Sequence, residues 1–102
     1  MERVFRIRHD DNRLEELEFD PQARTSWSQA IVKAFRKRMQ QLRSLNNECD
    51  FYQNRGMNFE ELSGGRKGDF SVRLNGQWRL MLRFEGTAPE KTMVIRAIED
   101  YH

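Results

Sequence analysis

The sequence contains too few cysteines and histidines for several common kinds of site. Cys49 is the one cysteine among 102 residues, which excludes an internal disulfide and is typical of a protein kept in a reducing cytoplasm. His9 and His102 are the two histidines, so a multi-histidine metal site is excluded unless carboxylates supply the other ligands. We therefore expect no bound metal and no cofactor.

Long apolar runs and several familiar motifs are also missing. No apolar run reaches the length of a membrane span, and the first residues have no signal-peptide pattern. The chain has no Walker loop, no GxGxxG and no HExxH. We therefore expect a cytoplasmic protein without a membrane partner, and the chain length predicts a single domain over residues 1–102.

What the sequence does contain is segregated positive charge. The net charge is only +2, yet residues 27–45 carry basic side chains and no acidic one. Most cationic residues in the chain are arginines, which suit bidentate phosphate contacts better than lysines do. A basic run alone is usually a solvated helix face. Beside an arginine-lined sheet, it favours a nucleic-acid or acidic-protein partner.

The second half of the chain is organised by alternating apolar and polar residues. This alternation is the period of half-buried strands, and it recurs in residues 70–74, 78–84 and 93–98. Asn75-Gly76 stands between the first two runs and predicts a hairpin turn, because both residues tolerate positive φ. We therefore predict a small sheet whose polar face carries Ser71, Arg73, Arg79 and Arg83.

The first half predicts one strand, a short helix and a long helix. Residues 4–8 alternate as a strand. A helix over residues 12–19 is expected to end at Asp20-Pro21, because the residue before a proline avoids the α region. Residues 47–63 have no clear period and predict a connector with one short turn at most.

The long helix is predicted over residues 26–45. Ser26 and Gln29 have the spacing of a capping box at its start. Apolar residues then recur at helical spacing and form one stripe, which is far more typical of a core face than of a binding site. Trp27 and Phe35 of this stripe are expected to pack on the inner face of the sheet.

Four motifs in the second half resemble those of one toxin family. They are LSGGR at residues 62–66, FSVRLN at 70–75, QWRL at 77–80 with the run continuing to Phe84, and DYH at 100–102. This half of the chain resembles the RelE/HigB family of toxins from bacterial type II toxin–antitoxin systems, and within it the HigB branch (plasmid maintenance killer proteins). The first half matches that family only in its pattern of elements.

The resemblance implies an α+β fold, in which N-terminal helices pack on one face of a small, mostly antiparallel sheet. It also implies a ribosome-dependent mRNA endonuclease that needs no metal and inhibits translation. The implied partners are the ribosome, messenger RNA and a cognate antitoxin that neutralises the toxin. The antitoxin is expected to be a HigA-like helix-turn-helix protein, and operator DNA would be met only through it.

Metal-free RNA cleavage limits which side chains can carry the chemistry. The neighbouring 2′-OH attacks the phosphodiester, so the site needs a base, an acid for the leaving 5′-oxygen and cations for the extra negative charge. His102 is the first candidate for proton transfer, because an unperturbed imidazole titrates near neutrality. Tyr101 is the second, and it could instead stack on a base. Arg73 and Arg79 share one strand face by their even spacing and would hold the scissile phosphate.

The other expected site residues surround this group. Arg66, in the Gly-rich turn, would contact the scissile phosphate or a flanking one, and Lys67 could supply a further positive charge. Asp100 corresponds to the family's terminal acidic residue and is expected to orient the reacting groups. Arg83 and Lys37 extend the expected RNA-binding surface along the sheet and the basic helix.

Some of these residues could instead have a purely structural role. Arg79 could pair with Glu85 or Glu99 across neighbouring strands. Trp78 falls in phase with the apolar face, so it is expected in the core rather than stacked on an RNA base.

Three positions depart from the family's pattern. Ser63 stands where many relatives have lysine, Gly65 where they have aspartate, and Glu60 where some have histidine. Serine carries no positive charge, so Lys67 would have to supply the charge that the relatives' lysine provides. Glu60 could serve as a base or simply be a solvated acid.

Two other functions stay open. A protein of this fold could act by binding alone, as ParE-like toxins inhibit gyrase, or be an inactive partner of an antitoxin; Ser63 and Gly65 favour this reading. A general nucleic-acid-binding module on residues 26–45 is disfavoured, because affinity follows the number of phosphates neutralised and the net charge is small. For antitoxin binding, the basic face of residues 26–45 and the helix at 12–19 are equally open.

Overall fold

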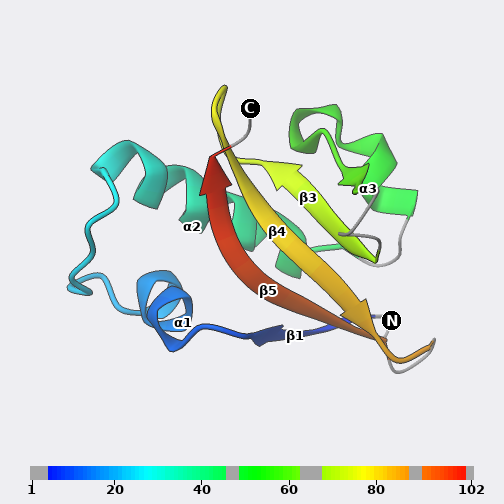
Figure 1. The fold of residues 1–102 in the computed structure, drawn as a ribbon, viewed down its shortest axis with the longest axis horizontal. Helices are drawn as coiled ribbons and strands as arrows, with labels where there is room; N and C mark the ends of the chain where they lie inside the picture. The colour runs from blue at the N-terminus through cyan, green and yellow to red at the C-terminus, as the bar shows by residue number, and fades with distance from the viewer. Residues whose placement is uncertain (1–4, 46–48, 63–67, 88–90, 101–102) are drawn as a thin grey trace.

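The strands form one five-stranded sheet in the computed structural model, which describes residues 5–45, 49–62, 68–87 and 91–100 (Figure 1). Across the sheet the strand order is β1-β5-β4-β3-β2. β1 runs parallel to β5, and all other neighbours are antiparallel, so the predicted mostly antiparallel sheet is confirmed. In chain order the strands are β1 (Phe5–His9), β2 (Glu60–Glu61), β3 (Asp69–Arg73), β4 (Trp78–Glu85) and β5 (Lys91–Asp100).

Helices cover one face of this sheet. α1 (Asn12–Phe19) and α2 (Gln29–Arg43) lie on it, and Figure 1 shows α2 crossing behind β4 and β5. α3 (Cys49–Gln53) and the 3-10 turn η1 (Arg55–Met57) lie beside β3. The α+β architecture with helices on one face is therefore as expected. In the ranges given above, no helix is long and apolar enough to cross a membrane.

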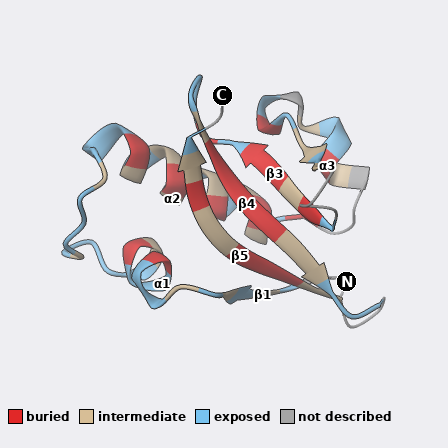
Figure 2. Ribbon diagram, in the orientation of Figure 1, coloured by how far each residue is buried: buried red, intermediate tan, exposed pale blue. Residues whose placement is uncertain are grey.

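The core lies between the sheet and the two longer helices (Figure 2). Burying each large apolar side chain there stabilises the fold by about 1.5–3 kcal/mol. Trp78 packs against this core, and its ring meets that of Trp27 edge to face at 5.1 Å, as the sequence predicts for both. The fully buried core side chains include Phe35, Met39, Leu42, Phe51, Met57, Val72, Leu80, Leu82, Met93 and Ile95.

Side-chain caps set the helix boundaries. Asp11 caps α1 by accepting a hydrogen bond from a backbone N–H of the first turn, and the helix ends before Asp20 as predicted. α2 begins later than predicted, because Ser28 is its N-cap. The predicted capping box of Ser26 and Gln29 is wrong, since Gln29 is already the first helical residue.

The β3–β4 hairpin forms where predicted, but by a different mechanism. Neither Asn75 nor Gly76 has a positive φ. Instead, the side-chain oxygen of Asn75 accepts hydrogen bonds from the backbone N–H groups of Gln77 and Trp78, at 3.0 and 2.9 Å. A side chain that bonds to the backbone two residues on closes a turn without left-handed residues.

The segment predicted as a connector contains α3, η1 and β2. Aromatic packing accounts for this order. Phe51 stacks on Phe59 at 4.2 Å, and Phe59 stacks on Phe70 of β3 at 5.2 Å. The segment is therefore organised by contacts with the sheet rather than by a local sequence period. For this reason, periodicity does not predict its helix, turn and strand.

The face of the sheet opposite the helices is here called the polar face. Residues that lie directly opposite each other on antiparallel strands point to the same face, so the register assigns its members. These are Arg6 and Arg8 of β1, Thr92, Val94, Ala97 and Glu99 of β5, Arg79, Met81, Arg83 and Glu85 of β4, and Asp69, Ser71 and Arg73 of β3.

Candidate functional site

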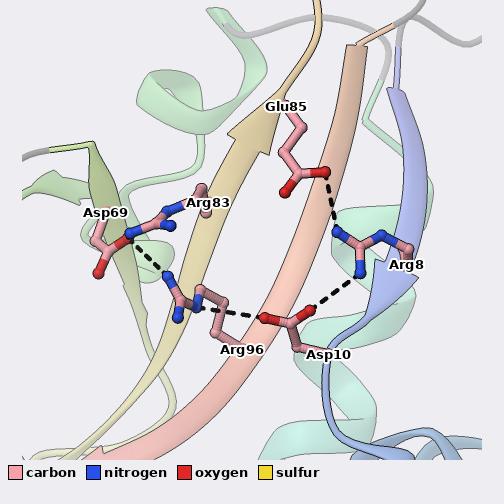
Figure 3. Close-up of polar contacts among 6 residues, drawn as sticks. All are labelled: Arg8, Asp10, Asp69, Arg83, Glu85 and Arg96. Atoms are coloured by element: carbon pink, nitrogen blue, oxygen red, sulfur yellow. Dashed lines mark hydrogen bonds and ion pairs between the residues drawn. The ribbon is translucent and has the colours of Figure 1, made fainter.

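A chain of ion pairs crosses the polar face near the start of β3 (Figure 3). On its β1 side, Arg8 lies 3.0 Å from Asp10 and 2.9 Å from Glu85 of β4. About half of each of these side chains is exposed, so each contact contributes little to stability. We call this series of contacts the ion-pair network. Its members are Glu85, Arg8, Asp10, Arg96, Asp69 and Arg83.

Arg96 joins the two halves of the ion-pair network. Its guanidinium lies 3.6 Å from Asp10 and 3.3 Å from Asp69. Asp69, whose side chain is 10% exposed, also holds Arg83 at 2.8 Å. A register shift between β4 and β5 leaves Arg96 as an extra residue, and such bulges redirect side chains. The bulge has no signature in the sequence, which is why sequence reasoning does not find Arg96.

The ion-pair network balances its own charge, with guanidiniums and carboxylates alternating along it (Figure 3). Arg83, expected from the sequence to contact RNA, is already engaged in this network, and its RNA contact stays a prediction. A phosphate that approached Arg83 would have to compete with the Asp69 carboxylate, which the two neighbouring guanidiniums hold in place.

The other end of the polar face, beside the β3–β4 hairpin, has a different charge balance. Arg73 is exposed there, and its Nε donates to the carbonyl of Asn75 at 3.2 Å. From α2, Arg38 donates to the carbonyl of Arg73 at 2.8 Å. In the described part of the chain no carboxylate pairs with Arg38 or Arg73. We call these two residues the cationic pair.

Arg38 is held rigidly beside Arg73. It also donates to the carbonyl of Gly56 at 3.1 Å and to the side chain of Gln41 at 2.5 Å. Burial and the neighbouring charge of Arg73 both lower the pKa of Arg38, although a guanidinium stays protonated at neutral pH. A fixed group of like charges without a counter-ion is favourable for binding an anion such as phosphate.

Arg79, which the sequence predicts to hold the scissile phosphate together with Arg73, is buried. It lies directly opposite Arg73 in the register, on the polar face as predicted, but it is only 4% exposed. Its Nε donates to the Ser71 hydroxyl at 2.7 Å, and its Nη2 donates to the carbonyl of Asn58. Arg79 therefore joins β4 to β3 and to the segment before β2. A phosphate contact of Arg79 stays a prediction.

Asp100 ends β5 beside the hairpin. Its carboxylate accepts a hydrogen bond from Gln77 Nε2 at 3.0 Å, and the register sets it opposite Trp78. The alternation of β5 therefore directs Asp100 to the helix-covered side, whereas Arg79 lies on the polar face. Arg73, Arg79 and Asp100 thus meet at one end of the sheet without sharing one face.

The basic run of α2 is largely used inside the fold. Arg36 donates to two backbone carbonyls at the end of α1, at 2.8 and 3.1 Å, and Arg43 pairs with a carboxylate of α1. Arg38 reaches the end of β3 and belongs to the cationic pair. Lys33 and Lys37 stay exposed on α2.

The remaining predicted site residues lie in β2 or outside the described ranges. Glu60 lies in β2, half-buried and opposite Ser71. Among the residues that the structure describes, no group of histidine, cysteine and carboxylate side chains could hold a metal ion. Six residues named from the sequence lie outside the described ranges: Ser63, Gly65, Arg66, Lys67, Tyr101 and His102.

A buried ionic group on the helix-covered side also involves a histidine. His9, with a side chain 3% exposed, lies 2.7 Å from the Glu18 carboxylate, and Arg43 holds the same carboxylate at 2.5 and 2.9 Å. Burial raises the pKa of Glu18, but the hydrogen bonds from Arg43 and His9 outweigh it and leave that pKa lowered. This group ties β1, α1 and α2 together away from solvent, so it serves the fold.

Comparison with known proteins agrees with this architecture. The sequence model of the family described as "RelE-like toxin of type II toxin-antitoxin system HigB" matches residues 7–102. Among solved structures, the chain is similar to a YoeB/ParE toxin from Agrobacterium tumefaciens, with a TM-score of 0.55 and 15% sequence identity. That likeness covers 95% of this chain and 99% of that chain, and at this identity it bears on the fold alone. A search of curated proteins gives no match.

Proposed function

This chain belongs to the HigB family of RelE-like toxins of type II toxin–antitoxin systems, and on that premise we propose that it is a metal-independent endoribonuclease that cuts messenger RNA on the ribosome. A toxin of this family has an antitoxin as its partner. The observation that carries the proposal is the cationic pair, Arg38 and Arg73, which has no described carboxylate beside it. It lies at the end of the sheet where β5 reaches Asp100, after which the chain continues with Tyr101 and His102.

In the proposed reaction, the 2′-OH attacks the adjacent phosphorus and the 5′-oxygen leaves. Arg73 holds the phosphate and neutralises the charge that develops on its oxygens. His102 takes the proton of the attacking 2′-OH and passes it to the leaving 5′-oxygen, and Tyr101 either assists or stacks on a base. Asp100 orients this end of the chain through its hydrogen bond with Gln77.

Other arginines and lysines take supporting parts in the proposal. Arg79 acts as a positioning residue, because its bonds to β3 and the segment before β2 support the strand that carries Arg73. Arg66 and Lys67 would contact the scissile phosphate or flanking ones. Arg83 would reach RNA only after releasing Asp69, and Lys37 would contact RNA that passes over α2.

Dependence on the ribosome follows from charge. The net charge of the chain is +2, and the ion-pair network uses three arginines internally. Few cationic groups are left to neutralise phosphates, so free RNA should bind weakly and a ribosome would have to present the substrate. We further propose that the toxin acts in the cytoplasm and is neutralised by a HigA-like helix-turn-helix antitoxin, through which alone it meets operator DNA.

Inducible expression in bacteria tests the nuclease directly. The intact chain is compared with a chain that ends at Asp100, and transcript ends are mapped by primer extension. We expect new ends within translated frames for the intact chain and none for the shortened one, because the proton-transfer groups are missing. Filter binding of the purified protein to RNA provides a control, and tight binding without ribosomes would contradict the proposed ribosome dependence.

A second candidate function is inhibition by binding alone, as in ParE-like toxins. The self-neutralised ion-pair network and the buried Arg79 favour it, because both leave the polar face with little free positive charge. Ser63 and Gly65, which replace the lysine and aspartate of many relatives, favour it as well. Growth arrest with intact transcripts in the same experiment would support this function over the nuclease.

A further inference from the structure

The edge of the sheet beside β5 is only partly covered by β1. The register between the two strands runs from Phe5 opposite Lys91 to His9 opposite Ile95, and the backbone N–H of Asp10 makes the last bond, 2.9 Å to the Ile95 carbonyl. Beyond this point the chain turns into α1. Figure 1 shows the second half of β5 continuing without a neighbour on the β1 side. Among the described residues, no strand pairs with residues 96–98 on that side.

Grooves flank this edge on both faces of the sheet. The polar-side groove has a volume of about 580 Å³ and is lined by Asp10, Asp69 and Arg96, among others. The helix-side groove has a volume of about 350 Å³ and is lined equally by apolar side chains, including Leu14 and Trp27, and by polar ones, including Arg24 and Thr25. Both grooves share the side chains of Asp11 and Arg13 and the β5 residue Ala97, so they meet at the strand edge.

From this arrangement we propose that residues 96–98 of β5 are the docking edge for an extended segment of the antitoxin, which adds to the sheet as a short strand. The backbone groups of a strand edge are a template for such pairing. Successive side chains of an added strand point to opposite faces, so they would enter the two grooves in turn. The proposal rests on the antitoxin partner of the family and is independent of the nuclease activity.

Charge selects a peptide over RNA as the occupant. The lining of the polar-side groove includes four carboxylates and two guanidiniums, which disfavours a phosphate backbone. The carboxylates that line the polar-side groove suit a basic side chain, and the apolar part of the helix-side groove, Leu14, Leu17 and Ile98, suits an aliphatic one. We therefore expect the docking segment of the antitoxin to alternate aliphatic and basic residues.

Amide hydrogen exchange, read by mass spectrometry, tests the docking edge in the unmodified toxin. The toxin is measured alone, with the purified cognate antitoxin, and with a short single-stranded RNA. We expect the peptide containing residues 96–98 to become protected by the antitoxin and unchanged by the RNA. A complex that forms without protecting this peptide would overturn the proposal. So would protection by RNA, or protection in the toxin alone that grows with concentration, which would assign the edge to a second copy.

A pair of variants tests the same edge by affinity. Ala97 and Thr92 lie on the same face of β5 and are both partly buried, but only Ala97 is beyond the end of β1. Ala97→Trp would fill the polar-side groove and is expected to weaken antitoxin binding by about tenfold or more. Thr92→Trp is the matched control and should bind nearly as the parent does. Equal affinities for two folded variants would overturn the docking edge whether or not the toxin cleaves RNA.

Discussion

The two ends of the polar face use arginine in opposite ways. In the ion-pair network each guanidinium lies beside a carboxylate, at 2.8 to 3.6 Å. At the hairpin end, the cationic pair bonds only to carbonyl and amide oxygens. The number of arginines on a face is therefore a poor measure of its affinity for phosphate. The partners of each guanidinium decide whether its charge serves the fold or is left for a ligand.

The largest expected effect is a difference in RNA cleavage between variants of Arg73 and of Arg83. Arg73→Ala should lower RNA cleavage by about 100-fold, because it removes a cation that acts on the developing charge. Arg83→Ala should lower cleavage only slightly, because Asp69 already uses that guanidinium. Both variants are measured by primer extension in cells, with ribosome-dependent cleavage in vitro as a second readout. Equal losses for the two variants would remove the distinction between the two ends.

Arg79 provides the next test, since it lies opposite Arg73 but is buried. Arg79→Ala should lower the free energy of unfolding by about 2–3 kcal/mol, because the buried Ser71 hydroxyl and the Asn58 carbonyl lose their donor. Arg73→Ala should change it by less than about 0.5 kcal/mol, as is usual for an exposed side chain. Urea unfolding followed by circular dichroism measures both values. Similar stabilities for the two variants would show that burial does not distinguish these arginines.

The smallest expected effect contrasts the buried ionic group with an exposed pair of the network. Glu18→Gln should cost about 1–2 kcal/mol at neutral pH, because the carboxylate accepts bonds from His9 and Arg43. Glu85→Gln should cost less than Glu18→Gln does, because its pair with Arg8 is exposed.

The pH dependence of the Glu18 effect has a definite sign. The pKa of Glu18 is lowered in the fold, so its extra stabilisation is present above the ordinary carboxyl pKa of about 4.3 and is lost as pH falls through the lowered value. The difference between Glu18→Gln and the parent chain should therefore shrink in acid. Thermal melts over a pH series measure it, and a difference that persisted at the lowest pH would contradict the ionic origin.

The periodic parts of the fold could be predicted from the sequence because their signals are local. The alternation in β3, β4 and β5 and the helical stripe of α2 each follow from one element burying one face. The proline after Asp20 ends α1 as expected. The motifs of the second half likewise predicted the family whose sequence model matches residues 7–102.

What the sequence by itself determined about this protein is thus its fold class, its apolar faces and its family. Tertiary structure alone decided the state of each charge, because charges acquire partners from distant segments. The Asn58 carbonyl accepts a hydrogen bond from Arg79, Asp69 and Asp10 pair with Arg96, and the carbonyl of Arg73 holds Arg38. The period of a strand predicts which face of the sheet a side chain lies on. It does not predict whether a carboxylate or a carbonyl of another segment will contact that side chain.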